Sequence, residues 1–282
     1  MVIAEKELVR ENYLAGWLLA LQGDGEYRIL NPLSRVSIEL PALEKLHHES
    51  RLIEELDRPD RVRCGPPRIN MIALSSSPSL SRSYAVMISY TRSSRFAFHR
   101  SGEDVWTVVS LATDLHRFTA RILGLIYYNG LFVALNADCE IMTLNWRNRR
   151  MEWRLDLGLN YYFDSDPHLV ECSGSLLVAW AISAEEYYGP AEEIRVFEVD
   201  LEKGTEEEVE SLGNMSLFLN GTSSFSVELN PESCLPGIKP NHVYFLDYDD
   251  DQMKSYSMED GELDTYFDAP ANHIYEWFQP HF

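Results

Sequence analysis

The segment "GWLLALQGDGEYRILNPLSRVSIELP", Gly16 to Pro41, decides the fold, because an apolar run leads straight into Gly23-Asp24-Gly25. A dinucleotide-binding loop needs a third glycine three residues further on, where a helix packs closely, but that position is Arg28. The residues that follow, "YRILN", have the composition of a strand. The segment therefore predicts a β-hairpin with Gly and Asp at its tip rather than a phosphate-binding loop.

The same succession of short strands and turns continues over almost the whole chain. Alternating, β-branched or aromatic runs recur, among them "YAVMISY", "LFVAL", "IRVFEVDL" and "HVYFLDY". The hairpin signals between such runs are Asn129-Gly130, Ser173-Gly174, Asp249-Asp250-Asp251 and Asp260-Gly261. Because the strands do not alternate with helices, a doubly wound parallel sheet is excluded, and the chain is predicted to be all-β.

The strands fall into groups of roughly forty to fifty residues, which is the size of a propeller blade. The groups begin at Gly16, near Ile69, near Ile122, at His168 and at Met215. We therefore predict a short extension over residues 1–15 and a single degenerate β-propeller over residues 16–282, with about five to six blades. The blades carry neither a WD nor a kelch signature. Two packed β-sandwiches remain the alternative architecture.

One segment has helical character, "PALEKLHHESRLIEEL" from Pro41 to Leu56. Its leucines and isoleucine lie partly at helical spacing, and proline stands in its first turn. The sequence thus predicts one short helical insertion near residues 41–56.

The charge balance restricts the kinds of partner. The chain has 45 acidic and 24 basic side chains and a net charge of −21, and its isoelectric point is about 4.7. Such a surface repels phosphate backbones and anionic headgroups, so we predict no nucleic-acid and no membrane partner. No apolar stretch reaches the ~18 residues that a membrane helix requires, and no secretory signal is recognisable.

The cysteines point to a reducing compartment. Cys64, Cys139, Cys172 and Cys234 lie far apart and form no C-x-x-C pair. This spacing argues against a zinc ribbon and against a dense disulfide framework. A cytoplasmic or nuclear location is therefore expected.

Two segments resemble metal sites, and neither completes the pattern. His47, His48 and Glu49 would need a further histidine at Leu52 to form a zinc-protease motif. In "DYDDDQ", Asp247 to Gln252, glutamine replaces the glycine that a calcium loop requires for its sharp turn. We expect a partly exposed helix in the first case and a solvated hairpin tip in the second.

No catalytic signature is present either. The G-x-S-x-G motif is absent, and no spacing singles out an acid–base pair. The sequence therefore identifies no catalytic, cofactor-binding or metal-binding residue and predicts no cofactor. Trp106 and Trp153 are interpreted as blade-packing residues rather than contacts.

Several segments together resemble the plant KIB-type β-propeller proteins, an F-box-associated group long described as a domain of unknown function. They occur in family order and cover nearly the whole chain from Gly16. The matching segments are "GWLLALQGDGEYRILNPLSRVSIELP", "AFHRSGEDVWTVV", "GLIYYNGLFVALNADCEIMTLN", "HLVECSGSLLVAW", "VFEVDLEKGTEEEVESLGNMSLFLNGTSSFSV", "GIKPNHVYFLDYDD" and "WFQP".

The resemblance implies a role in ubiquitination. Members of the family carry an F-box that docks onto a Skp1-type adaptor, and the propeller then presents a substrate to a cullin-based ubiquitin ligase. Here fifteen residues precede Gly16, too few for three helices. We therefore expect no F-box and no adaptor contact, and the alternative is that the sequence is truncated at this end, in which case the family role is retained. The strands that usually open the first blade are also missing, so an incomplete first blade is expected.

The sequence hypothesis is a non-enzymatic, protein-binding propeller that resembles the substrate-recognition domain of F-box receptors of SCF-type ubiquitin ligases. Its expected partner is an unidentified protein, such as a ubiquitination substrate, and the acidic surface favours basic partners. Two alternatives stay open: a hydrolase or lyase with its active site at the centre of the propeller, and a degenerate family copy without function.

Overall fold

The structure is a computed structural model of the 282-residue chain. It describes the following residues: 13–14, 16–21, 26–43, 46, 68–90, 95–109, 121–157, 166–182, 192–219, 221, 224–230, 237–247 and 252–268.

These residues form twenty-one strands in five sheets. In chain order the strands are β1 (Tyr13–Leu14), β2 (Trp17–Leu21), β3 (Tyr27–Leu30), β4 (Ser37–Glu39), β5 (Ile69–Leu74), β6 (Ala85–Tyr90), β7 (Arg95–Arg100), β8 (Thr107–Val108), β9 (Ile122–Tyr128), β10 (Leu131–Asn136), β11 (Glu140–Asn145), β12 (Arg150–Asp156), β13 (His168–Cys172), β14 (Ser175–Ile182), β15 (Glu193–Asp200), β16 (Thr205–Glu208), β17 (Met215–Phe218), β18 (Phe225–Glu228), β19 (His242–Asp247), β20 (Gln252–Ser257) and β21 (Leu263–Asp268).

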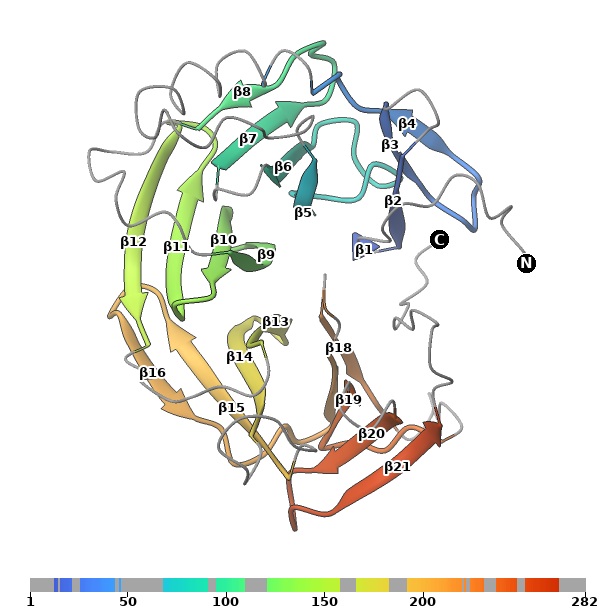
Figure 1. Ribbon diagram of the computed structural model, residues 1–282, viewed down its shortest axis with the longest axis vertical. Coiled ribbons are helices and arrows are strands. Elements are labelled where there is room, and N and C mark those ends of the chain that lie inside the picture. Colours follow the sequence, from blue (N-terminus) through green and yellow to red (C-terminus); the bar gives the residue numbers. More distant parts are fainter. Residues whose placement is uncertain are drawn as a thin grey trace, which may run out of the picture.

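The five sheets stand around a common centre as the blades of a propeller (Figure 1). Blades 1 to 4 are β1–β4, β5–β8, β9–β12 and β13–β16, and blade 5 is β17–β21. Blades 2 to 5 begin at Ile69, Ile122, His168 and Met215, as the sequence predicts. The all-β class and the propeller are confirmed with five blades, and the sandwich alternative is wrong.

Tight turns set the register within the blades. Between β9 and β10, Asn129 and Gly130 have φ of 47° and 84°, as a two-residue hairpin of the primed type requires. Ser173 and Gly174 repeat this geometry between β13 and β14, with φ of 49° and 86°. The predicted Gly23-Asp24-Gly25 tip lies outside the described residues, but β2 and β3 on either side pair antiparallel, so this segment joins a hairpin.

The first blade has an innermost strand, although a very short one. The sequence predicts an incomplete first blade, and β1 consists of Tyr13 and Leu14 alone. These residues pair antiparallel with Leu18 and Trp17 of β2. Blade 1 therefore has the four strands of a regular blade, and two residues of the innermost strand lie in the described part of the chain.

Blade 5 departs from the pattern of the other four. It has five strands in the order β18-β17-β19-β20-β21, and β17 runs parallel to β19. β18 thus takes the innermost position, where it packs against β13 of blade 4. The sequence predicts hairpins throughout and does not predict this parallel pair.

Buried side chains fill the seams between consecutive blades. Four hydrophobic clusters each join two neighbours, from blades 1 and 2 through to blades 4 and 5. Fully buried members include Trp17 and Ile88 in the first seam, Phe96 and Phe132 in the second, Leu135 and Ile141 in the third, and Val196 and Leu217 in the fourth. The alternation along each strand explains why one blade supplies residues to two clusters.

The face of blade 5 turned away from blade 4 is built differently. The ring of Phe218 stacks on those of Phe225 and Tyr244, with centroids 5.1 and 4.9 Å apart. The Tyr266 ring meets Tyr244 edge to face at 5.6 Å. Among the described residues, no hydrophobic cluster joins blade 5 to blade 1.

The helical insertion predicted near 41–56 is not supported. Most of it lies outside the described residues, as do His47, His48 and Glu49. At its start, the Leu46 amide donates to the Leu43 carbonyl at 3.0 Å, and both side chains are buried in the seam between blades 1 and 2. The described elements are strands without exception.

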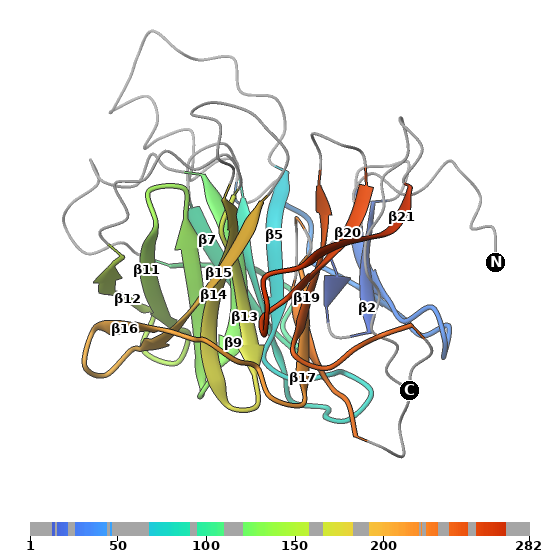
Figure 2. The ribbon, with the colours of Figure 1, turned by 90° about the horizontal axis from the view of Figure 1, so that it is seen from below.

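One end of the propeller is described almost completely. Within a four-stranded antiparallel blade, the turns after the first and third strands lie at the same end. Figure 2 shows this end at the bottom, with the loop 75–84 in cyan and the turn 31–36 in blue. We call this end the turn face.

Candidate interaction surface

Charge divides the propeller into two parts. Residues 1–157, which include blades 1 to 3, carry 19 acidic and 20 basic side chains, whereas residues 158–282 carry 26 acidic and 4 basic ones. The whole negative excess of the chain therefore belongs to the part that contains blades 4 and 5.

The few cations of blades 4 and 5 are already engaged with carboxylates. Each of the four forms an ion pair, as follows: Arg195 with Glu208 at 2.6 Å, Lys203 with Asp200 at 2.6 Å, Lys239 with Asp264 at 3.2 Å and Lys254 with Asp247 at 2.8 Å.

The hairpin β15–β16 carries the densest group of these carboxylates. β16 is the outermost strand of blade 4, and all four of its residues, Thr205–Glu208, are exposed. Three glutamates of the hairpin, Glu202, Glu206 and Glu207, have no ion pair with any described residue, and neither has Glu210, which follows β16. We call Glu202, Glu206, Glu207 and Glu210 the acidic rim of blade 4.

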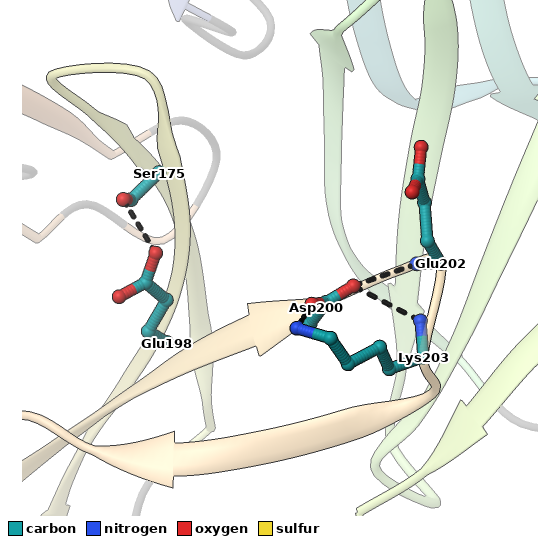
Figure 3. Close-up of polar contacts among 5 residues, drawn as sticks. All are labelled: Ser175, Glu198, Asp200, Glu202 and Lys203. Atoms are coloured by element: carbon teal, nitrogen blue, oxygen red, sulfur yellow. Dashed lines mark hydrogen bonds and ion pairs between the residues drawn. The ribbon is translucent and has the colours of Figure 1, made fainter.

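The turn of this hairpin is held rigidly (Figure 3). One carboxylate oxygen of Asp200 accepts the amide protons of Glu202 and Lys203, each at 3.0 Å, and the other accepts from Lys203 Nζ at 2.6 Å. The hydrogen bond from the Lys203 side chain is the main cause that lowers the pKa of Asp200. The turn closes with the Gly204 amide donating to the Asp200 carbonyl at 2.8 Å.

Two further contacts fix the strands of the hairpin. The Arg195 guanidinium donates twice to Glu208, at 2.7 and 2.6 Å, and lowers the pKa of that carboxyl group. The Ser175 hydroxyl donates to Glu198 at 2.6 Å across the neighbouring pair of strands (Figure 3). The acidic rim is thus displayed from a pre-ordered backbone.

The Asp200 turn is one copy of a turn motif that recurs in other blades and that the sequence patterns did not reveal. In blade 1, Asn31 Oδ1 accepts from the amides of Leu33 and Ser34, and Arg35, with φ of 60°, closes the turn on the Asn31 carbonyl at 2.8 Å. In blade 3, Asn145 Oδ1 accepts from the amides of Arg147 and Asn148.

The residues of this turn motif have a recognisable spacing. A short polar residue ends the third strand or directly follows it, and a residue with positive φ follows four positions later, as in Asn31 and Arg35, or Asp200 and Gly204. In blade 5 the same spacing follows the fourth strand, β20, where the Gly261 amide donates to the Ser257 carbonyl at 2.9 Å. Such residues hydrogen-bond to the backbone two or three positions ahead.

The residues considered for metal or catalytic chemistry have structural environments. Asp247 is buried and paired with Lys254, while the rest of the predicted loop tip, 248–251, lies outside the described residues. Within the described ranges, no three His, Cys, Asp or Glu side chains gather to hold a metal ion. Burial is the main cause that raises the pKa of the Cys139 thiol to about 11, which makes this cysteine a poor nucleophile.

The tryptophan expected in blade packing lies there. Trp106 belongs to the seam between blades 1 and 2, and its Nε1 donates to the Pro41 carbonyl at 2.6 Å. The side chain of Trp153, in β12, lies outside the described part of the structure. Near the innermost strands, the Ser224 hydroxyl lies 3.3 Å from His168 Nδ1, and this contact ties blade 5 to blade 4.

The family follows from a comparison with known protein families. The model of the family described as "KIB1-4 beta-propeller" matches residues 3–266, which is nearly the whole chain. The chain belongs to the KIB1-4 β-propeller family. The resemblance found in the sequence is therefore confirmed. No curated protein matches this KIB1-4 propeller significantly.

Solved structures resemble the KIB1-4 propeller only distantly. A crystal structure described as BBS1N in complex with ARL6DN, soaked with mercury, is 14% identical with a TM-score of 0.42, and the match covers 93% of this chain and 66% of that one. A structure described as YCF48 bound to D1 peptide is 10% identical with a TM-score of 0.40, covering 95% and 71%. The chain spans less than two thirds of the first of these structures.

One further property concerns membranes. In the part of the KIB1-4 propeller that the structure describes, no helix is long and apolar enough to cross a bilayer.

Proposed function

We propose that this KIB1-4 propeller is a non-enzymatic protein-binding module that recognises a basic partner through the acidic rim of blade 4. The observation that carries the proposal is the partition of charge, with 26 acidic and 4 basic side chains in residues 158–282 against 19 and 20 in residues 1–157. A partner with clustered lysines or arginines would be steered toward one side of the molecule.

Protection of a sheet edge is the competing explanation for the rim. Natural proteins place charges on edge strands to prevent pairing with other chains, and β16 is an edge strand. β16 has three glutamates in four residues. Among the other outermost strands, β8 has no charged residue, β12 has two acidic and two basic ones, and β21 has two acidic residues in six. β16 thus has a higher density of carboxylates than these other edge strands.

The family supports a more specific role. KIB-type propellers resemble the substrate-recognition domains of F-box receptors, so we propose that the partner is a protein delivered for ubiquitination. A location in the cytoplasm or nucleus accords with this role, and the free, buried thiols of Cys139 and Cys172 accord with a reducing compartment.

Affinity capture with matched variants tests the proposal. Glu206→Lys/Glu207→Lys reverses two exposed charges of the rim, and Glu39→Lys/Asp138→Lys makes the same change in charge at exposed positions of blades 1 and 3. Proteins retained by the wild type and by the control, but lost by the rim variant, are the expected result. Equal retention by all three would contradict recognition through the rim.

A further inference from the structure

The turn between β11 and β12 of blade 3 is rich in arginine. Its sequence from Asn145 to Arg150 is "NWRNRR", with three arginines and no acidic residue. Asn145 pairs with Arg150 across the hairpin, and Asn145 Oδ1 accepts the amide protons of Arg147 and Asn148 at 3.0 and 3.4 Å. The turn follows the third strand of its blade, so it lies on the turn face with its backbone restrained by these contacts.

A half-buried tryptophan in this turn holds two guanidinium groups. The guanidinium carbon of Arg147 lies 5.3 Å from the centre of the Trp146 ring, and that of Arg100 lies 5.1 Å from it. Arg100 comes from the end of β7 in blade 2 and donates from Nη2 to the Trp146 carbonyl at 3.4 Å. The Trp146 ring packs against the seam between blades 2 and 3 and meets Phe98 edge to face at 6.4 Å. These contacts join side chains of two blades into one surface.

The fold leaves much of the positive charge of this surface unneutralised. Arg147 and Arg149 are exposed and form no ion pair with a described residue. Arg100 has the Glu103 carboxylate at 3.9 Å, but both side chains are more than a third exposed, so solvent weakens their attraction. Arg100 Nε is covered and has no hydrogen-bond partner in the described part of the chain.

The charge balance stays positive when the neighbouring acidic residues are counted. Residues 100–104 and 145–150 together carry four basic and two acidic side chains, and the acidic ones are Glu103 and Asp104. Stacking alone is a weak reason for the arrangement, because a cation over an aromatic ring contributes little at an exposed site. Two guanidinium groups near one ring also repel each other, and a bound anion relieves that repulsion.

We infer that Arg100, Trp146, Arg147 and Arg149, the arginine–tryptophan surface, bind a protein segment with clustered carboxylates. A guanidinium group offers paired N–H donors that match the two oxygens of a carboxylate. The tryptophan ring restrains two of these groups before binding, which lowers the entropy lost when a partner binds.

The distribution of charge favours carboxylates over other anions. The positive charges are spread over two turns, so several successive carboxylates fit them better than one phosphate group does. A nucleic acid would be repelled by the net charge of −21. The inference is independent of the proposed function, which concerns blade 4 and a basic partner.

A peptide titration on the full chain tests this inference. The probe is a short fluorescein-labelled peptide of successive glutamates, followed by fluorescence anisotropy, and the same peptide with glutamines is the neutral comparison. The glutamate peptide alone should bind, and it should move the indole N–H signal of Trp146 in NMR spectra, which Trp146→Phe assigns. Arg147→Glu/Arg149→Glu should weaken its affinity at least about tenfold, the size of effect found at interface hot spots. Arg147→Lys/Arg149→Lys, which keeps the charge but not the paired donors, should give a smaller loss.

Arg35→Glu/Arg82→Glu is the matched control. It makes the same change in net charge at two exposed arginines of the turn face that also have no ion pair with a described residue. This control should bind the glutamate peptide as the wild type does, and equal urea midpoints exclude misfolding as the cause of a loss. The inference is overturned if the glutamate peptide does not bind or if both double variants to glutamate weaken it equally. Binding of a phosphoserine peptide in place of the glutamate peptide would also overturn it and would assign the surface to a phosphorylated partner.

Discussion

Blades 1 to 3 and blades 4 and 5 share one architecture but differ in charge. Both parts bury alternating apolar residues in their seams and close their blades with the same capped turn. Yet residues 1–157 carry almost equal numbers of acidic and basic side chains, and residues 158–282 carry 26 and 4. The comparison teaches that the fold depends on apolar alternation and turn geometry, and that the exposed charge is free to serve recognition.

The largest expected effect on stability comes from Lys254, the buried cation of residues 158–282. The Lys254 and Asp247 side chains are 10% and 4% exposed. Lys254→Met leaves a buried carboxylate without its cation and should lower the free energy of unfolding by about 3–5 kcal/mol. Urea unfolding monitored by tryptophan fluorescence measures this. Asp247→Leu/Lys254→Met, which removes both charges, should recover most of the loss, and a single variant as stable as wild type would contradict the account.

The next effect concerns the seam where the two parts meet. A Cβ on Gly124 of β9 would lie 2.8 Å from Leu169 Cβ of β13, so these innermost strands approach too closely for any side chain. Gly124→Ala should therefore destabilise the protein by about 1–3 kcal/mol through overpacking. Adding Leu169→Ala should restore part of that loss in the same urea assay. Unchanged stability of Gly124→Ala would show that the seam is looser than the structure indicates.

A smaller effect on stability depends on pH and arises in blade 2, within the part of the chain whose charges balance. His99 is 4% exposed in blade 2, and burial is the main cause that lowers its pKa below the usual value. The unfolded state therefore binds more protons, and the stability that neutral His99 contributes is lost as pH falls below about 6.5, by at most about 1.4 kcal/mol per pH unit. Thermal melts of the wild type and His99→Gln between pH 7 and pH 5 check this. Parallel curves would contradict it.

The smallest effect on stability is expected at the acidic rim. Glu206 and Glu207 are exposed and have no ion pair with a described residue, so Glu206→Lys/Glu207→Lys should leave the urea midpoint unchanged or slightly higher. A marked loss of stability would contradict this expectation, because it would mean that these glutamates stabilise the fold.

The sequence predicts the propeller because its signals are local. Hairpin turns such as Asn129-Gly130 and the starts of the blades at Ile122 and His168 are encoded within a few residues. The parallel pairing of β17 with β19 joins strands separated by β18 and a long connection, and no local pattern specifies it.

The candidate surfaces were less predictable from the sequence. Overall acidity and a preference for basic partners follow from composition, but the gathering of the acidic rim on and beside one edge strand depends on strand order. Leu80, which is exposed, lies in a loop whose Ser77 accepts hydrogen bonds from the Leu80 amide and from Trp17 Nε1 of blade 1. A leucine in a polar loop gives no sequence signal of its own.

The central claim, recognition through the acidic rim, is tested most directly by cross-linking the captured partner to the propeller with a reagent that joins carboxylates to lysines. Peptide mapping by mass spectrometry then locates the joined residues. We predict that the cross-links concentrate on Glu202, Glu206, Glu207 and Glu210, with lysine-rich segments of the partner at the other end. Cross-links confined to carboxylates of blades 1 to 3 would contradict the account.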